Sequence, residues 1–117
     1  DELLFDLISK ISEKFDDLKP KNQTCFANLV LNYSTLCTFK PEMCVNLMEI
    51  VVAIIKPEIN NVALLRLLSA CGNLALFSDQ AKMKLQFHPE IVLDLTSSPI
   101  TNECKYVLND IANLMKS

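Results

Sequence analysis

Apolar and polar positions along the chain recur with the three- and four-residue spacing of amphipathic helices. Two clear apolar stripes are Leu4, Leu7, Ile8, Ile11, Phe15 and Leu18, and then Met43, Leu47, Ile50, Val51, Ile54 and Ile55. Residues 60–77 are apolar on nearly all sides, so this segment is expected to form the most buried helix. The pattern predicts an all-α protein.

Five prolines separate the helical stretches. They are Pro20, Pro41, Pro57, Pro89 and Pro99, and each lies where a fixed φ angle and a missing backbone N–H are tolerated. We therefore expect helices near residues 2–18, 22–38, 42–56, 60–77, 79–96 and 100–116, with the fifth broken before Pro89. Because the connections are short, successive helices should be antiparallel neighbours.

The predicted helices also indicate a repeat. The second helices of successive pairs begin near residues 22, 60 and 100, close to the roughly 40-residue period of armadillo and HEAT repeats. A related block recurs late in each of them: Leu-Asn-Tyr-Ser at 31–34, Gly-Asn-Leu-Ala at 72–75 and Leu-Asn-Asp-Ile-Ala at 108–112. The sequence thus predicts that residues 1–117 form a single armadillo/HEAT-like helical-repeat solenoid of about three antiparallel helix pairs.

Composition and charge argue against several other classes. A single glycine and few aromatic residues disfavour a β-sandwich or a barrel. A net charge of −3 gives no electrostatic reason to expect nucleic acid as a partner. The longest apolar stretch, Val62 to Phe77, is interrupted by Arg66 and Asn73 and is too short to span a bilayer, so no membrane association is expected.

The residues that often carry chemistry are not grouped for it. Five cysteines without CxxC spacing, each in a helical apolar run, are typical of reduced core thiols in a cytoplasmic or nuclear protein. His88 has no partner at ligand spacing, so neither a metal nor a cofactor is expected. With one glycine, a Gly-x-Ser-x-Gly nucleophile elbow is impossible. We therefore expect a binding protein and not an enzyme.

Polar residues form a stripe on each of the second helices. The stripes are Thr24, Asn28, Asn32 and Thr35; Arg66, Ala70, Asn73 and Phe77; and Asn102, Tyr106, Asn109 and Asn113, with Lys105 beside the last. Asparagine is a poor residue for a helix interior, but its amide offers a donor and an acceptor to the backbone of an extended peptide. In a stacked array we predict a peptide-binding groove formed by Asn28, Asn32, Arg66, Asn73, Lys105 and Asn109. Alternatively, the asparagines are simply exposed.

Two residues of the fourth predicted helix need a particular reason to be there. Arg66 lies among apolar residues, where an unpaired guanidinium would be costly to bury. It pairs with an acidic side chain of this chain, extends to solvent, or awaits an anionic ligand such as a carboxylate. Gly72 costs about 1 kcal/mol relative to alanine inside a helix. Close packing of a neighbouring helix, the explanation we favour, or close approach of a ligand backbone would justify it.

Three blocks of the sequence resemble a known family. They are Leu-Val-Leu-Asn-Tyr-Ser at 29–34, Leu-Arg-Leu-Leu-Ser-Ala-Cys-Gly-Asn-Leu-Ala at 65–75 and Glu-Cys-Lys-Tyr-Val-Leu-Asn at 103–109. In order and spacing they are similar to the PUL domain of the phospholipase A2-activating protein and its fungal ubiquitin-recycling counterparts. The resemblance runs from about residue 20 to the end and covers about the second half of that domain, which in the family is a six-repeat armadillo-like array.

The resemblance implies a function and a partner. It implies an adaptor in ubiquitin-dependent protein turnover that binds the acidic C-terminal tail of the hexameric valosin-containing AAA ATPase. Arg66 matches an arginine of the family's groove for this tail. Two alternatives remain, a generic armadillo or HEAT scaffold for another peptide and a structural segment that dimerises. Leu3, Leu4, Leu7 and Ile11 form an apolar face at the N-terminal end, through which we expect self-association.

Overall fold

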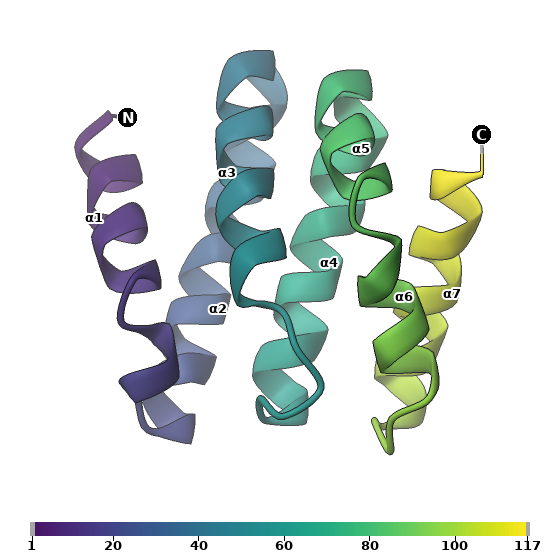
Figure 1. Cartoon of the computed structure of the whole chain (residues 1–117). Helices are drawn as coiled ribbons and strands as arrows, with labels where there is room; N and C mark the ends of the chain where they lie inside the picture. Colours follow the sequence, from purple (N-terminus) through teal and green to yellow (C-terminus); the bar gives the residue numbers. More distant parts are fainter. Residues whose placement is uncertain (1, 117) are drawn as a thin grey trace.

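The computed structural model describes residues 2–116, and over this range the chain is all-helical, with no strand (Figure 1). The helices are α1 (Glu2–Ser12), α2 (Pro20–Leu36), α3 (Pro41–Ile54), α4 (Asn61–Phe77), α5 (Asp79–Gln86), α6 (Pro89–Thr96) and α7 (Asn102–Met115). The short 3-10 turns η1 (Phe15–Asp17) and η2 (Cys37–Phe39) follow α1 and α2. The predicted all-α class is confirmed.

Proline sets several of the helix starts. Pro20, Pro41 and Pro89 each occupy the first turn of a helix. There the fixed φ is already helical, and the missing N–H would have had no partner within the helix. The predicted break in the fifth helix is confirmed, since α5 ends at Gln86 and α6 begins at Pro89.

One predicted helix is too long. The helix expected over residues 2–18 stops at Ser12, and the chain then turns through η1. The turn places Phe15 in the core, with 1% of its surface exposed and its ring 5.8 Å from that of Phe26 in α2. Burial of this ring against α2 stabilises the bend, because a packed aromatic pair contributes about 0.5–1.5 kcal/mol beyond the area that it buries.

The helices form two layers (Figure 1). Helices α2, α4 and α7 run in the same direction in one layer, where α4 packs against α2 on one side and α7 on the other. Helices α1, α3, α5 and α6 form the other layer, in which α3 lies between α1 and α5. This packing fits an α-solenoid, while the repeat type and the number of helix pairs stay predictions.

Helix α4 supplies more buried residues than any other described helix, as predicted. They are Ala63, Leu64, Leu67, Leu68, Ala70, Cys71, Leu74 and Ala75. The helix is therefore the centre of the core and holds its neighbours in α2 and α7 in place. Within residues 2–116, no helix has the length and apolar character that a membrane crossing requires.

The cysteines are free, and four of them are buried: Cys37, Cys44, Cys71 and Cys104. Burial raises the pKa of the Cys71 thiol to about 12, because the thiolate would lose its hydration. Cys25 is exposed on α2, so the prediction of a core thiol is wrong at that position. Its place in an apolar run of the sequence does not reveal which side of α2 it occupies.

The apolar face expected at the N-terminal end is only partly exposed. Leu3 and Leu7 are exposed, as predicted, whereas Leu4 and Ile11 pack against the core. The two exposed leucines lie four residues apart and so share one side of α1. Self-association through this side stays a prediction.

Candidate functional site

The polar stripe of α2 meets that of α4 along the seam between the two helices. Arg66 of α4 is half-buried there, and its Nε donates a hydrogen bond to Asn28 Oδ1 over 2.9 Å. Farther along the seam, Asn73 Nδ2 donates to Oγ of the buried Ser34 over 3.0 Å. Asn32 is exposed on α2, between Asn28 and Ser34 in sequence. The structure thus brings three of the predicted site residues, Asn28, Arg66 and Asn73, to the α2–α4 seam.

A further set of hydrogen bonds lies where α4 begins. Asn60 Nδ2 donates to the backbone oxygen of Pro20 over 3.0 Å, and its Oδ1 accepts from Thr24 Oγ1 over 3.2 Å while capping α4. Asn61 Oδ1 accepts from the backbone N–H of Thr101 over 3.3 Å, which links α4 to α7. Neither asparagine was among the residues predicted from the sequence. The available signal was an asparagine directly before an apolar helix, where it is a preferred N-cap residue.

Four of the hydrogen bonds between helices of this layer join residues at a nearly constant separation along the chain, while those of Thr24 with Asn60 and of Cys104 with Asn61 span 36 and 43 residues. The separation is 38 residues for Asn28 and Arg66, 39 for Ser34 and Asn73, and 40 both for Pro20 and Asn60 and for Asn61 and Thr101. A constant offset means that equivalent positions of successive helices face each other. It supports the roughly 40-residue period expected from the sequence.

Lys105 and Asn109 lie apart from the group at the α2–α4 seam. Both are exposed on α7, and they line a hollow of about 350 Å³ together with Val92 and Thr96 of α6. Their side of α7 therefore faces α6 and not the seam that holds Arg66. The predicted site is divided into two groups on neighbouring parts of the molecule.

Among residues 2–116, no carboxylate lies within ion-pair distance of Arg66. Neither α2 nor α4 contains an aspartate or a glutamate. The described ion pairs are those of Lys56 with Asp16, Lys84 with Glu49 and His88 with Glu90. Within this range the partner of Arg66 is the neutral amide of Asn28 and not an acidic side chain. The guanidinium is therefore held in place without being neutralised.

Gly72 lies on the same helix as Arg66, and its surroundings correct an expectation. A Cβ atom at this position would meet no heavy atom within 4 Å apart from the glycine's own neighbourhood in α4. Close packing of a neighbouring helix, the explanation favoured from the sequence, is therefore wrong. The missing side chain leaves the backbone of α4 open next to Asn73.

His88 belongs to a different part of the surface. Its Nδ1 lies 2.9 Å from Glu90 Oε1 at the start of α6. A hydrogen bond from the backbone of Glu90, and then the one to His88, hold the pKa of that carboxyl below its usual range. In the part of the chain that the structure describes, no three His, Cys, Asp or Glu side chains lie together as a metal site would require.

The packing and the surface together define the class of protein. An α-solenoid with an exposed face of amides around one cation is suited to binding another protein. The sequence model of the PUL domain matches residues 1–107, so the chain belongs to the PUL domain family, whose members are protein-interaction domains and not a catalytic family. The match begins at residue 1 and not near residue 20, so α1 is part of the family region. Comparisons with curated proteins and with solved structures gave no match.

Proposed function

We propose that this PUL domain is an adaptor module in ubiquitin-dependent protein turnover. On this proposal it binds the acidic C-terminal tail of the valosin-containing AAA ATPase through the exposed side of the α2–α4 seam. The observation that carries the proposal is Arg66, a half-buried cation held by the neutral amide of Asn28 on two helices without acidic residues. The resemblance of the Arg-Leu block at 65–75 to the family's tail-binding block supports the choice of partner.

The geometry of Arg66 suits a carboxylate. The bond to Asn28 uses one of the five N–H donors of the guanidinium. The terminal nitrogens keep enough donors for a carboxylate to accept two parallel hydrogen bonds, which are stronger than neutral ones. Since the Nε bond already fixes the plane of the fork, less side-chain entropy is lost when a ligand binds.

The surroundings of Arg66 suit the backbone of an extended peptide. The exposed amide of Asn32 offers a donor and an acceptor to a peptide bond. Gly72 allows a ligand backbone to approach α4 closely, because no side chain stands in the way. We therefore place the tail across the seam, with its acidic side chain at Arg66 and its backbone near Gly72.

Beyond the seam, the next helix of the same layer is α7. Packed helices lie about 8–10 Å apart, and an extended residue spans about 3.3–3.6 Å, so about three residues cover one helix spacing. A tail that starts over α2 therefore reaches α7 after about six residues. Lys105 and Asn109 face α6, so the proposed tail-binding site consists of Arg66 and the amides of the α2–α4 seam and does not include these two residues.

The proposal extends to the context of the domain. We propose that residues 1–117 are the second half of an armadillo-like PUL array and that the protein acts in the cytoplasm, with a nuclear pool. A generic armadillo or HEAT scaffold for a different peptide is the competing function. It would use the same amides but would not require an acidic ligand.

A titration with the tail peptide tests the proposal. A fluorescein-labelled peptide of the ATPase tail is titrated with the chain and followed by fluorescence anisotropy, beside the same peptide with its acidic residues changed to glutamine or asparagine. We expect saturable binding of the acidic peptide and at least tenfold weaker binding of the neutral one.

Variants of the chain locate the binding. Arg66→Gln should weaken the acidic peptide at least tenfold, whereas Lys10→Gln on α1 removes the same charge from the other layer and should leave the affinity unchanged. Equal binding of the acidic and neutral peptides would favour the generic scaffold. Equal binding by wild type and Arg66→Gln would remove Arg66 from the site.

A further inference from the structure

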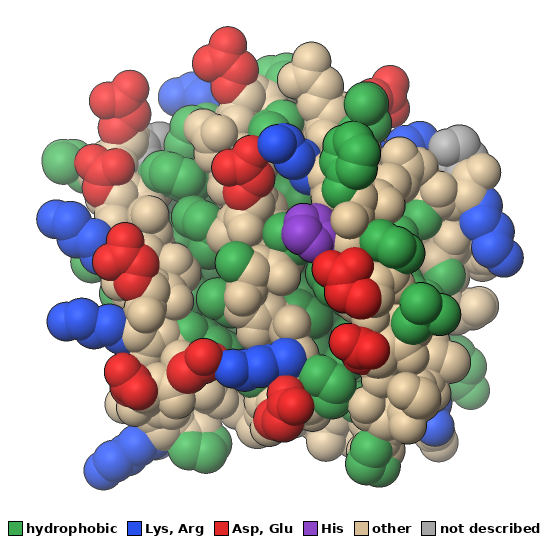
Figure 2. All heavy atoms as spheres, in the orientation of Figure 1, with side chains coloured by type: hydrophobic (Ala, Val, Ile, Leu, Met, Phe, Trp, Pro, Cys, Tyr) green, Lys and Arg blue, Asp and Glu red, His purple; other side chains and the backbone are tan. Residues whose placement is uncertain are grey.

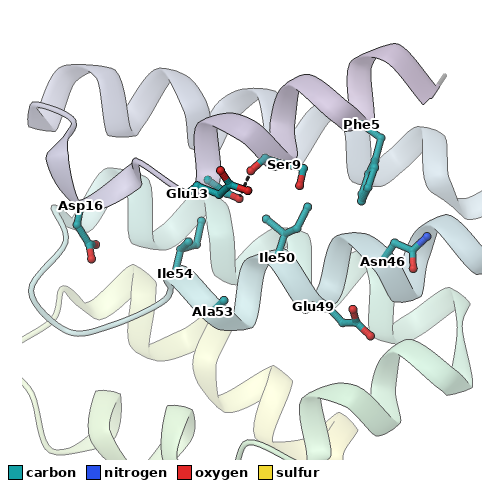
Figure 3. Close-up of a pocket in the computed structure, with 10 residues that line it drawn as sticks. Phe5, Ser9, Glu13, Asp16, Asn46, Glu49, Ile50, Ala53 and Ile54 are labelled. Carbon is teal, nitrogen blue, oxygen red and sulfur yellow. Dashed lines mark hydrogen bonds between the residues drawn. The ribbon is translucent and has the colours of Figure 1, made fainter.

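A second surface lies in the layer opposite to Arg66. A hollow of about 580 Å³ separates α1 from α3 (Figure 3). Phe5, Ile50 and Ile54 form its apolar floor, and Figure 3 shows Phe5 reaching from α1 toward α3 while Ile50 points back toward α1. Phe5 and Ile50 are only half-buried although both are large and apolar. A further apolar side chain would therefore be stabilised by burial against them.

Small side chains explain why the hollow is open. Ser9 and Ser12 of α1 and Ala53 of α3 line it. Ser12 Oγ donates to the backbone oxygen of Ser9 in its own helix over 2.6 Å, the dashed bond of Figure 3, and so does not reach across to α3. Helix α1 accordingly packs against α3 less extensively than α3 packs against α5.

The charged residues that line this hollow are all acidic: Glu13, Asp16 and Glu49. Asp16 pairs with Lys56 and Glu49 pairs with Lys84, whose Nζ lies 2.9 Å from Oε1, so these two charges are compensated at the rim. Glu13 takes part in no ion pair within residues 2–116. Figure 3 shows it between Asp16 and Ser9, beside the apolar floor, and Figure 2 shows that acidic and basic side chains are interspersed over this face.

We infer that the hollow between α1 and α3 binds an amphipathic helical segment of a partner protein that carries a lysine or arginine next to a large apolar residue. The apolar side chain packs onto Phe5 and Ile50, and the cation pairs with the uncompensated Glu13. This is the recognition of a helix in a groove, with the charge of the groove selecting the charge of the ligand.

The surface is independent of the proposed tail-binding face. It lies in the other layer, is formed by other helices, and carries the opposite charge from Arg66. A segment that fits this hollow would be repelled from Arg66, and an acidic tail would be repelled from Glu13. The molecule can therefore hold both ligands at once, and either site can be tested without the other.

A designed probe tests the inference. The probe is a fluorescein-labelled helical peptide of leucine, lysine and alanine with leucine on one side, and its matched control has glutamate in place of every lysine. Anisotropy titrations use the wild-type chain, Glu13→Gln, and Glu58→Gln as a charge-matched control outside the hollow. Backbone amide NMR spectra of the labelled chain locate the bound probe.

We expect the lysine probe to bind and to shift the amides of Ser9 and Ala53, and the glutamate probe not to bind. Glu13→Gln should weaken the lysine probe about tenfold, while Glu58→Gln and Arg66→Gln leave its affinity unchanged. Equal weakening by Glu13→Gln and Glu58→Gln would mean nonspecific attraction to an acidic protein and would overturn the inference. So would shifts confined to α2 and α4, or shifts of Ser9 and Ala53 that appear on concentrating the chain alone, because the occupant would then be a second copy.

Discussion

The α2–α4 seam and the α1–α3 hollow lie in different layers, and each is formed by two neighbouring helices of its own layer. They differ in what lies between the two helices. Long polar side chains cross the seam, where Arg66 bonds to Asn28 and Asn73 bonds to Ser34. The hollow is lined by small side chains such as Ser9 and Ala53, which leave the space empty. The same helical packing therefore gives a closed, polar surface in one layer and an open, partly apolar one in the other.

The two regions also differ in the charge of the side chains that their helices supply. Helices α2 and α4 contain no acidic residue, whereas the turn after α1, η1 and α3 supply the three carboxylates that line the hollow. A solenoid repeats its backbone, but each layer can vary its exposed side chains without disturbing the core. Two faces of one small domain can thus be selected for ligands of opposite charge.

The largest expected effect comes from shortening a core side chain of α4, compared with shortening an apolar side chain that lines the hollow. Leu64→Ala on α4 removes a fully buried side chain and should lower the free energy of unfolding by about 2–5 kcal/mol. Ile50→Ala in the hollow should cost no more than about half as much, because that side chain is already half-exposed. Urea denaturation followed by circular dichroism measures both. Equal losses would show that the hollow is closed in solution.

The next largest effect is the loss of acidic-tail affinity when Arg66 is replaced. Arg66→Ala should reduce the binding free energy of the acidic tail by about 1.5–3 kcal/mol, the contribution of one charge-assisted bond. Arg66→Lys should restore it only in part, because a point charge cannot reproduce the planar fork. Anisotropy titrations measure the affinity, and thermal denaturation of the same variants measures stability. A large drop in Tm with unchanged affinity of the folded protein would assign Arg66 a structural role.

The dependence of the two affinities on salt concentration is a control for the Arg66 variants. Exposed charge pairs are screened over about 8 Å at physiological ionic strength, so added salt should weaken the acidic tail and the lysine probe alike. The Arg66 variants should change only the first of these two salt dependences. Tail binding that is insensitive to salt would indicate an apolar contact instead.

The fold could largely be predicted from the sequence, because periodicity and proline report local geometry. The break between α5 and α6 follows directly from Pro89. The early end of α1 could not be predicted, since it depends on Phe15 meeting Phe26 in another helix. The apolar stripe through Phe15 looks the same whether the helix continues or turns.

The candidate site was harder to predict for the same reason. The sequence indicates that Arg66 needs a partner, but it does not show that Asn28 becomes that partner. Helical spacing places Lys105 and Asn109 on one side of α7, yet only the packing of α6 shows which neighbour they face. The α1–α3 hollow was missed entirely, because an empty space depends on side chains of two helices together.

A smaller effect concerns the polar contacts where α4 begins. Asn60→Ala removes the N-cap of α4 and the bond to the backbone of Pro20, and should lower the free energy of unfolding by about 1–2 kcal/mol. Asn60→Asp keeps the cap acceptor but loses the donor to Pro20, so its loss should be smaller. Denaturant titrations of the two variants measure the difference. If Asn60→Asp is as destabilising as Asn60→Ala, the contact with α2 and not the cap provides the stability.

The smallest effect has the opposite sign and tests why α4 contains a glycine. Gly72→Ala should raise the free energy of unfolding by up to about 1 kcal/mol, because alanine is the better helix former and its Cβ meets nothing within 4 Å. The same methyl group stands where the proposal places the backbone of the acidic tail, so tail affinity should fall while binding of the lysine probe in the α1–α3 hollow stays unchanged. Thermal denaturation and the two anisotropy titrations measure these three quantities on one variant. A stabilised protein with undiminished tail affinity would leave Arg66 as the anchor but would move the peptide backbone away from Gly72.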